Sequence, residues 1–209
     1  MKTKLISTQN AQAYLLAAKI LQKGGIVAFP TDTVYGLAAD IQSTPGIELL
    51  FNAKQRAPSK AIAVLMSSPA DLARVAIDVS PQAKQLAEEF WPGPLTLILA
   101  RHPSLPAILG QQPTIGVRMP DHPDALALMD LTGPLAVTSA NLSGEANACT
   151  AQDVLQQLDG RVDLILDGGI TPGGTPSTVV DCTSSRLQIL RSGPISSEEL
   201  QTIWENPNI

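Results

Sequence analysis

The chain has 209 residues, of which 44% are hydrophobic, 16% are charged and 3% are aromatic. These proportions are typical of a globular protein with an aliphatic core, and they exclude a disordered chain. A formal net charge of −5 at pH 7 disfavours a protein that binds nucleic acid without sequence preference, because such proteins are usually strongly basic.

Apolar residues spaced three and four apart predict a first helix over 11–21, which Gly24-Gly25 ends, and a short buried strand follows at 26–29. Ser43-Thr44-Pro45 is typical of a helix start and predicts a second helix that carries Lys54 and stops before Pro58. The remaining predicted elements are, in chain order, strand 61–66, helix 80–90, strands 95–100 and 114–117, helix 123–131, strand 135–138, helix 150–158, strands 162–166, 178–181 and 187–191, and a short helix from 196.

Many short strands interleaved with helices predict a mixed α/β fold around one twisted sheet. The sequence contains no internal repeat, low-complexity tract or clear linker, so we expect one domain over residues 1–209. The stretch from Gly168 to Pro176 is rich in glycine and proline and is expected to form a loop within this domain.

The cysteines and histidines do not indicate a metal site. Cys149 and Cys182 lie far apart, and neither they nor His102 and His122 have a further ligand at the spacing of a zinc site. The N-terminal residues turn polar too soon for a signal peptide, and no apolar run approaches the ~20 residues that cross a bilayer. We therefore expect a cytoplasmic protein without a membrane segment.

The segment Pro30–Gly36 directly follows the predicted strand 26–29 and contains Thr31 and Asp32. A strand end is a rigid place from which a hydroxyl can contact a ligand. Alternatively, these residues only form a turn in which their side chains bond the local backbone. This segment alone favours the turn.

Lys54 and Arg56 are expected near a helix end or in the following loop. From a loop, both cations can reach one anion, with Arg as a planar fork and Lys as a point charge. Alternatively, they only complement the helix dipole, which stabilises by ~0.3–1 kcal/mol. The pair alone favours the dipole interpretation, while Lys60 adds a third cation that favours an anion site.

Arg118 directly follows the predicted strand 114–117, where a buried charge needs a partner. Either it pairs with a carboxylate of the protein, such as Asp121, or it binds the carboxylate of a ligand. The physical chemistry of buried ion pairs does not separate these two alternatives.

Small polar residues follow the predicted strand 135–138 and precede the predicted strand 178–181. Ser139 and Asn141 suit either a polar ligand site or an ordinary turn ended by Gly144, and alone they favour the turn. Ser177 follows a glycine-rich stretch that matches neither a Walker A loop nor a Rossmann fingerprint, although such a stretch can admit phosphate close to the backbone.

Taken together, these segments resemble the YrdC-type threonylcarbamoyl-AMP synthases. The resemblance extends from about Leu15 to Pro194, and Lys-x-Arg followed much later by Ser-x-Asn is the signature of that family. It implies an α/β fold with a concave, positively charged face, in a form without the additional C-terminal domain of some relatives. The matching segments are 23–37, 54–56, 91–96, 117–120, 138–144 and 177–181.

The resemblance also implies an activity. Members use ATP with Mg²⁺, bicarbonate and L-threonine to make threonylcarbamoyl-AMP and pyrophosphate, and other proteins then transfer the threonylcarbamoyl group to tRNA. Lys54 and Arg56 are the implied catalytic residues. The implied ATP-binding residues are Lys54, Arg56, Ser139, Asn141, Ser177 and Arg191, and the implied threonine-binding residues are Thr31 and Arg118.

Three other functions stay open. A non-catalytic RNA-binding or ribosome-maturation module could use the same concave face, although the acidic net charge and few aromatic residues disfavour it. A related enzyme that adenylates carbamoyl groups from another donor usually has further domains. A divergent paralogue is also compatible, because Ala57, Ala61-Ile62 and Ser192 replace residues usual in the family.

Overall fold

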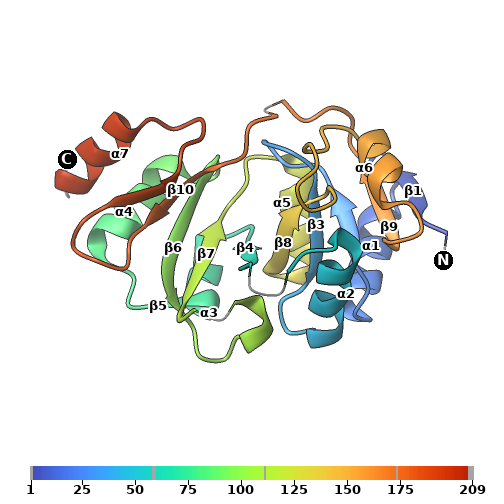
Figure 1. Cartoon of the computed structure of the whole chain (residues 1–209), viewed down its shortest axis with the longest axis horizontal. Helices are drawn as coiled ribbons and strands as arrows, with labels where there is room; N and C mark the ends of the chain where they lie inside the picture. The colour runs from blue at the N-terminus through green and yellow to red at the C-terminus, as the bar shows by residue number, and fades with distance from the viewer. Residues whose placement is uncertain (1, 58–59, 111, 173, 207–209) are drawn as a thin grey trace.

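A mixed β-sheet of eleven strands runs across the part of the molecule that the computed structural model describes, residues 2–57, 60–110, 112–172 and 174–206 (Figure 1). The path through the sheet is β1-β9-β2-β3-β8-β4-β7-β6-β10-β11, and β5 pairs with β6. The strands are β1 (Lys4–Ser7), β2 (Val27–Phe29), β3 (Gly36–Asp40), β4 (Ala63–Leu65), β5 (Ala76–Ile77), β6 (Leu95–Arg101), β7 (Thr114–Arg118), β8 (Leu135–Ser139), β9 (Leu164–Asp167), β10 (Thr178–Asp181) and β11 (Gln188–Arg191).

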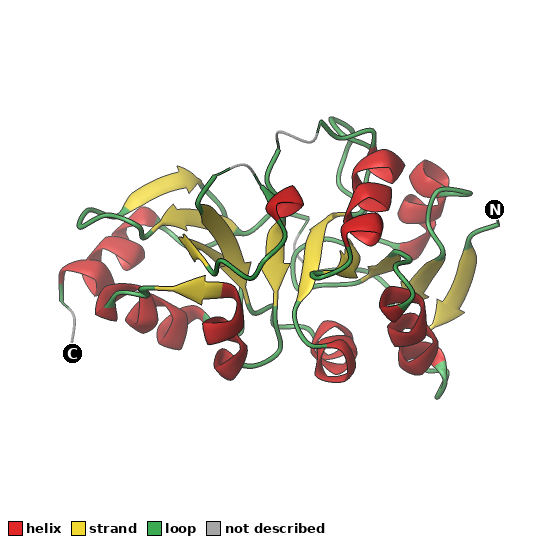
Figure 2. Ribbon diagram, turned by 90° about the horizontal axis from the view of Figure 1, so that it is seen from below, coloured by secondary structure: helices red, strands yellow, loops and turns green. Residues whose placement is uncertain are grey.

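Helices lie on both sides of the sheet (Figure 2). They are α1 (Ala13–Gln22), α2 (Thr44–Lys54), α3 (Leu72–Val75), α4 (Pro81–Phe90), α5 (Pro123–Thr132), α6 (Ala151–Leu158) and α7 (Ser197–Glu205), with 3₁₀ turns η1 (Pro69–Asp71) and η2 (Ala107–Leu109). None of these helices, in the residues described, is long and apolar enough to cross a bilayer.

Local sequence determines where several helices begin. The Ser43 hydroxyl caps α2 and the Ser80 hydroxyl caps α4, and a proline follows each of them in the first turn. Thr150 and Asp153 form the predicted capping box of α6, in which the Asp153 N–H donates to the Thr150 hydroxyl at 3.1 Å. These helix starts are therefore confirmed.

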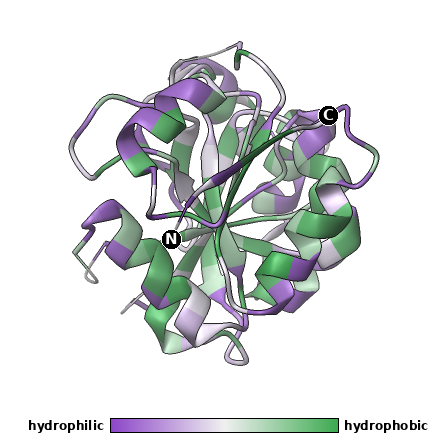
Figure 3. Ribbon diagram, turned by 90° about the vertical axis from the view of Figure 1, so that its right-hand side faces the viewer, coloured by the Kyte–Doolittle hydropathy of each residue, from purple (hydrophilic) through white to green (hydrophobic). Residues whose placement is uncertain are grey.

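Each face of the sheet contributes to its own hydrophobic core. Side chains of α2, α4, α6 and α7 pack on one face, and those of α1 and α5 pack on the other. Figure 3 shows hydrophobic residues gathered along the central strands and hydrophilic residues on outward surfaces of the helices. Since α1 and α5 cover only the strands around β9, β2, β3 and β8, the same face stays open over β4, β7 and β6.

The predicted α/β class with a mixed, helix-flanked sheet is confirmed, but three strands were missed: β1, β3 and the two-residue β5. β3 is buried although its sequence is Gly36-Leu37-Ala38-Ala39-Asp40, whose small residues have low strand propensity. It forms because β2 and β8 pair with it on both sides. β1 is a mostly exposed edge strand, without the apolar pattern that predicts a strand.

Candidate functional site

A cavity of about 310 Å³ lies over the middle of the sheet. Its floor comes from alternate residues of three adjacent strands, and residues two apart on a strand point to the same face. The β2–β3 loop and the segment before β10 add polar walls. The described residues around it include Thr31, Thr33, Tyr35, Arg56, Ala63, Leu65, Thr96, Ile98, Gly116, Arg118, Thr138, Ser139, Asn147, Ser177, Val179 and Arg191.

Small residues keep the floor of the cavity low. Gly116 lies on β7 between Thr96 and Ile98 of β6 and the small Ala63 of β4. A Cβ at this position would approach the Thr96 methyl group at 3.2 Å and the Ile98 side chain at 3.3 Å. Ala63 is the neighbour on β4, 3.5 Å from the same point. The space above the floor therefore exists because these strand positions have almost no side chain.

Arg118 is held in the cavity wall by three protein acceptors. It ends β7, is only 5% exposed, and donates through Nε to the Gly93 carbonyl at 3.0 Å and through Nη1 to the Thr33 hydroxyl at 3.0 Å. Its Nη2 forms an ion pair with Asp32. Burial lowers the pKa of Arg118, and the Asp32 carboxylate opposes this. The protein carboxylate that pairs with Arg118 is therefore Asp32, and not the Asp121 considered from the sequence.

Thr31 forms the turn that the sequence alone favoured, and it also lines the cavity. Its hydroxyl donates to the Val34 carbonyl at 2.6 Å and accepts from the N–H groups of Thr33 and Val34 at 3.2 and 3.3 Å. The proton and both acceptor positions of the Thr31 hydroxyl are thus already used within the turn.

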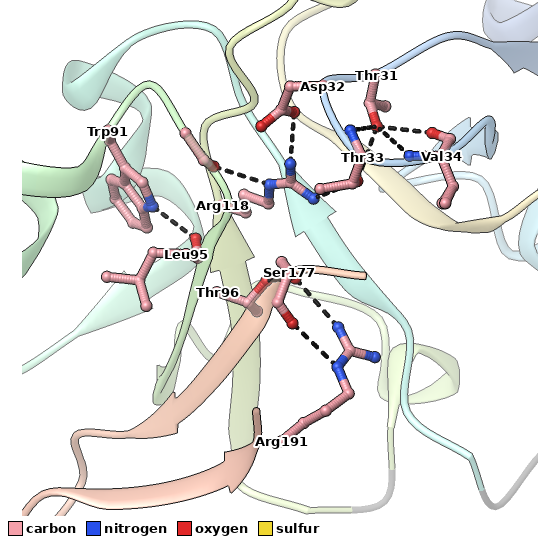
Figure 4. Close-up of polar contacts among 11 residues, drawn as sticks. Thr31, Asp32, Thr33, Val34, Trp91, Leu95, Thr96, Arg118, Ser177 and Arg191 are labelled. Atoms are coloured by element: carbon pink, nitrogen blue, oxygen red, sulfur yellow. Dashed lines mark hydrogen bonds and ion pairs between the residues drawn. The ribbon is translucent and has the colours of Figure 1, made fainter. Parts of the chain in front are cut away.

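Arg191 and Ser177 form the opposite side of the site (Figure 4). Arg191 donates through Nε to the Ser177 carbonyl at 3.0 Å and through Nη2 to the Ser177 hydroxyl at 3.1 Å, and Thr96 lies 2.8 Å from that hydroxyl. Partial burial and then the positive charge of Arg118 lower the pKa of Arg191. The two guanidinium groups thus face the same cavity, and both contribute positive charge to it.

Arg56 provides a third guanidinium. Its Nη2 donates to the Ala61 carbonyl at 2.9 Å, whereas its buried Nε has no hydrogen-bond partner among the described residues. Burial lowers the pKa of Arg56. A buried N–H without an acceptor is costly, so this side chain suits a ligand that brings acceptor oxygens. Pro58, expected to end the preceding segment, lies outside the described residues.

Lys54 points away from the cavity wall. It is 1% exposed at the end of α2, and its ammonium group donates to the carbonyls of Ser139 and Asn141, with the Asn141 side-chain oxygen 3.4 Å away. Lys54 therefore holds the turn after β8, and this turn places Ser139 in the wall. Burial, and secondly the charge of Arg56, lower the pKa of Lys54 to about 7.

Because of Lys54, we expect the free energy of unfolding to rise with pH above about 7. The folded protein releases the Lys54 proton near pH 7, whereas the unfolded chain keeps it up to its ordinary pKa of 10.5, so the unfolded state binds more protons between these values. The slope for one such group approaches about 1.4 kcal/mol per pH unit. Urea unfolding of the wild type and of Lys54→Met, from about pH 6 to about pH 9, measures this contribution. The stability of the wild type relative to the variant should increase with pH, and a constant difference would contradict the assignment.

Asn141 also lies behind the wall. It is buried, and its amide nitrogen donates to the carbonyls of Leu142 and Glu145 at 2.9 and 2.8 Å. Among the described residues, Asn141 and Lys54 belong to the support of the turn and not to the cavity lining. Contact of either side chain with a nucleotide stays a prediction.

The loop from Gly168 is tied to the β2–β3 segment and to the residues before α6. The Tyr35 hydroxyl donates to the Gly169 carbonyl at 2.8 Å, and the Gly174 N–H donates to the Thr33 carbonyl at 2.9 Å. Thr171 donates to the Cys149 carbonyl. Burial, above all, raises the pKa of Tyr35 to about 12, so its hydroxyl keeps this contact at neutral pH. Gly173 of this glycine-rich loop lies outside the described residues.

The structure thus brings six of the eight residues singled out from the sequence to one cavity: Thr31, Arg56, Arg118, Ser139, Ser177 and Arg191. Sequence reasoning missed the roles of Asp32, Thr33 and Thr96. All three stand in the segments that carried the family resemblance, which was the available signal. The described residues contain no cluster of three or more His, Cys, Asp or Glu arranged for a metal, and the described lining contains no carboxylate.

Comparison with known proteins agrees with this architecture. Residues 19–193 match the family Sua5_yciO_yrdC, described as "Telomere recombination". The chain belongs to this family. The match includes all eight of the residues singled out from the sequence, so the Sua5/YciO/YrdC resemblance is confirmed.

Two relatives of this family indicate an activity. A Bacillus subtilis protein named threonylcarbamoyl-AMP synthase is 39% identical over 96% of this chain and 59% of its own length. A Pyrococcus abyssi protein of the same name is 37% identical over 90% of this chain and 56% of its own length. The chain thus spans less than two thirds of the length of these two relatives.

A solved structure supports the fold in three dimensions. The crystal structure of P. abyssi Sua5 complexed with L-threonine superposes with a TM-score of 0.92 at 34% sequence identity. The match covers 97% of this chain and 61% of that chain. That structure therefore shares the fold of essentially this whole chain.

Proposed function

We propose that the protein is an L-threonylcarbamoyladenylate synthase, which makes threonylcarbamoyl-AMP and pyrophosphate from ATP, bicarbonate and L-threonine. The observation that carries the proposal is the meeting of Arg56, Arg118 and Arg191 at one cavity. Such a site suits one carboxylate and several phosphates, the charges that threonine and ATP bring together. The names of the relatives and the threonine complex of P. abyssi Sua5 support this choice of substrates.

The reaction needs little proton transfer by the protein. The amine of threonine and bicarbonate condense to an N-carboxy group with loss of water. An oxygen of this group forms a bond to the α-phosphorus of ATP, and the bond from that phosphorus to the β-phosphate oxygen breaks, so pyrophosphate leaves. Positioning and charge stabilisation carry most of such an adenylyl-transfer step, which is consistent with a site built from arginines and hydroxyls.

We assign the cations to different parts of the substrates. Arg56 and Arg191 would bind phosphate oxygens, together with the hydroxyls of Ser177 and Ser139. Arg118 would bind the carboxylate of threonine, with Thr31 next to it. Lys54 would act with Asn141 through the turn that carries Ser139, because its ammonium group already bonds the carbonyls of this turn.

Mg²⁺ is proposed to arrive with ATP as part of the substrate. Mg²⁺ is commonly bound through substrate phosphates with only one or two protein carboxylates. The described lining offers arginines and hydroxyls, which fit the phosphates and not a hard cation. The metal would reduce the charge of the phosphates, while Arg56 and Arg191 hold their remaining oxygens.

The product is a reactive mixed anhydride, and the proteins that use it are the proposed partners. We propose that it is handed to proteins that transfer the threonylcarbamoyl group to tRNA in the cytoplasm. Contact of this chain with tRNA itself is a secondary part of the proposal. The net charge of −5 favours transfer by other proteins over tight tRNA binding by this one.

Pyrophosphate release tests the function. Purified protein with ATP, Mg²⁺ and bicarbonate should release pyrophosphate only when L-threonine is added, and L-serine should be a much poorer substrate because it lacks the methyl group. Omission of bicarbonate should abolish release. ATP binding without any threonine-dependent release would contradict the proposal and favour a divergent paralogue, and salt-sensitive tRNA binding without turnover would favour an RNA-binding module.

A further inference from the structure

Three contacts with the protein orient the Arg118 side chain. A guanidinium group has five N–H donors, and three of those of Arg118 already point at Gly93, Thr33 and Asp32. These acceptors come from two separate segments, the β2–β3 loop and the turn before β6. The direction of the remaining N–H groups is therefore set before any ligand binds.

Asp32 differs from the other two partners in charge and in place. It is a carboxylate, and the described lining of the cavity includes Thr31, Thr33 and Arg118 but not Asp32. In Figure 4, Asp32 lies on one side of Arg118, and Ser177 and Arg191 lie on the other. A substrate in the cavity can thus meet Arg118 without meeting Asp32.

The cavity contains a second target for a free arginine. Arg191 lies close enough to Arg118 for their like charges to interact, and both line the same space. Without its anchor, the Arg118 fork could turn towards phosphates bound near Arg191. Held by Asp32, it keeps its place at the end of β7, where it meets the Thr31–Thr33 turn.

We propose that Asp32 is a positioning residue for threonine, which acts through Arg118 and keeps this arginine for the substrate carboxylate. The inference rests on the proposed function and extends it, because it assigns substrate selectivity to a residue outside the cavity. The role is orientation through a hydrogen-bond acceptor. An asparagine, which keeps an acceptor oxygen of the same reach without the charge, should therefore replace Asp32 in part, and an alanine should not.

The experiment compares Asp32→Ala, Asp32→Asn and the control Asp121→Asn, whose carboxylate is exposed and close in sequence to Arg118. Steady-state pyrophosphate release gives kcat and the KM for each substrate. We expect Asp32→Ala to raise the KM for L-threonine at least about tenfold, and to change the KM for ATP and kcat at saturating threonine less than about threefold. Asp32→Asn should raise the KM for L-threonine clearly less than Asp32→Ala does, and Asp121→Asn should stay within about threefold of the wild type on every constant.

Two results would overturn the inference. If Asp32→Asn raises the KM for L-threonine as much as Asp32→Ala does, the charge of Asp32 matters and not its orienting hydrogen bond. Equal increases in the KM values for ATP and threonine would show a general structural role. Thermal unfolding of each variant identifies one that does not fold, and in that case the asparagine variant and calorimetric titration with L-threonine decide. A wild type that binds L-threonine without releasing pyrophosphate contradicts the proposed function alone, since the same titration still tests Asp32. A wild type that binds no threonine contradicts both.

Discussion

Arg118→Lys is expected to raise the KM for L-threonine about a hundredfold while the KM for ATP changes less than about threefold. Lysine keeps the positive charge but cannot form the planar fork that binds both oxygens of a carboxylate. It also cannot reach Gly93, Thr33 and Asp32 at once, as Arg118 does. We therefore expect the free energy of unfolding to fall by about 2–4 kcal/mol, because buried acceptors lose their donor.

The two effects of Arg118→Lys are separable. Urea unfolding gives the loss of stability, and kinetics well below the unfolding transition give the substrate constants of the folded variant. Arg186→Lys is the matched control, since Arg186 is an exposed arginine in the turn between β10 and β11. Equal increases in the KM values for threonine and ATP would contradict the assignment of Arg118 to the threonine carboxylate.

Arg56→Ala is expected to reduce kcat for pyrophosphate release about a hundredfold or more, which corresponds to about 2.7–4 kcal/mol of lost transition-state stabilisation. The free energy of unfolding should stay close to that of the wild type. Among the described residues, the Arg56 side chain bonds only the Ala61 carbonyl, and its buried Nε lacks a partner. The alanine variant therefore removes an unsatisfied donor together with one hydrogen bond.

Arg186→Ala serves as the control for Arg56→Ala, because it removes the same chemical group far from the cavity lining. Unfolding curves of both variants should lie within about 1 kcal/mol of the wild type. Near-wild-type turnover of Arg56→Ala would remove Arg56 from the proposed catalytic residues. A large loss of stability would instead indicate that the loop after α2 depends on this side chain.

Features with local causes could be predicted from the sequence. The capping residues of α2, α4 and α6 lie within three residues of the N–H groups that they satisfy, and the spacing of apolar residues identified most strands. β3 could not be predicted in this way, because its glycine and alanines carry almost no strand signal. It depends on β8, which pairs with it from about a hundred positions away.

In the candidate site, too, contacts between distant segments could not be predicted from the sequence. Residue types identified Arg118 as a charge that needs a partner, but the partner is Asp32, which is 86 positions away. Lys54 was recognised as part of a signature, whereas its direction towards the Ser139 and Asn141 carbonyls depends on how the turn after β8 packs against α2. Which of two nearby cations faces the cavity is decided by this packing and not by their spacing.

The contacts of Arg118 also concern folding. They join the β2–β3 loop, the turn before β6 and the end of β7, which are segments that meet only when both halves of the sheet have assembled. Loop closure over such separations is slow and costs entropy. A ligand that binds this assembled arginine selects the complete fold over partly open forms, and stabilises it by RT ln(1 + [L]/Kd). Under the proposed function, L-threonine would therefore stabilise the complete fold in addition to serving as a substrate.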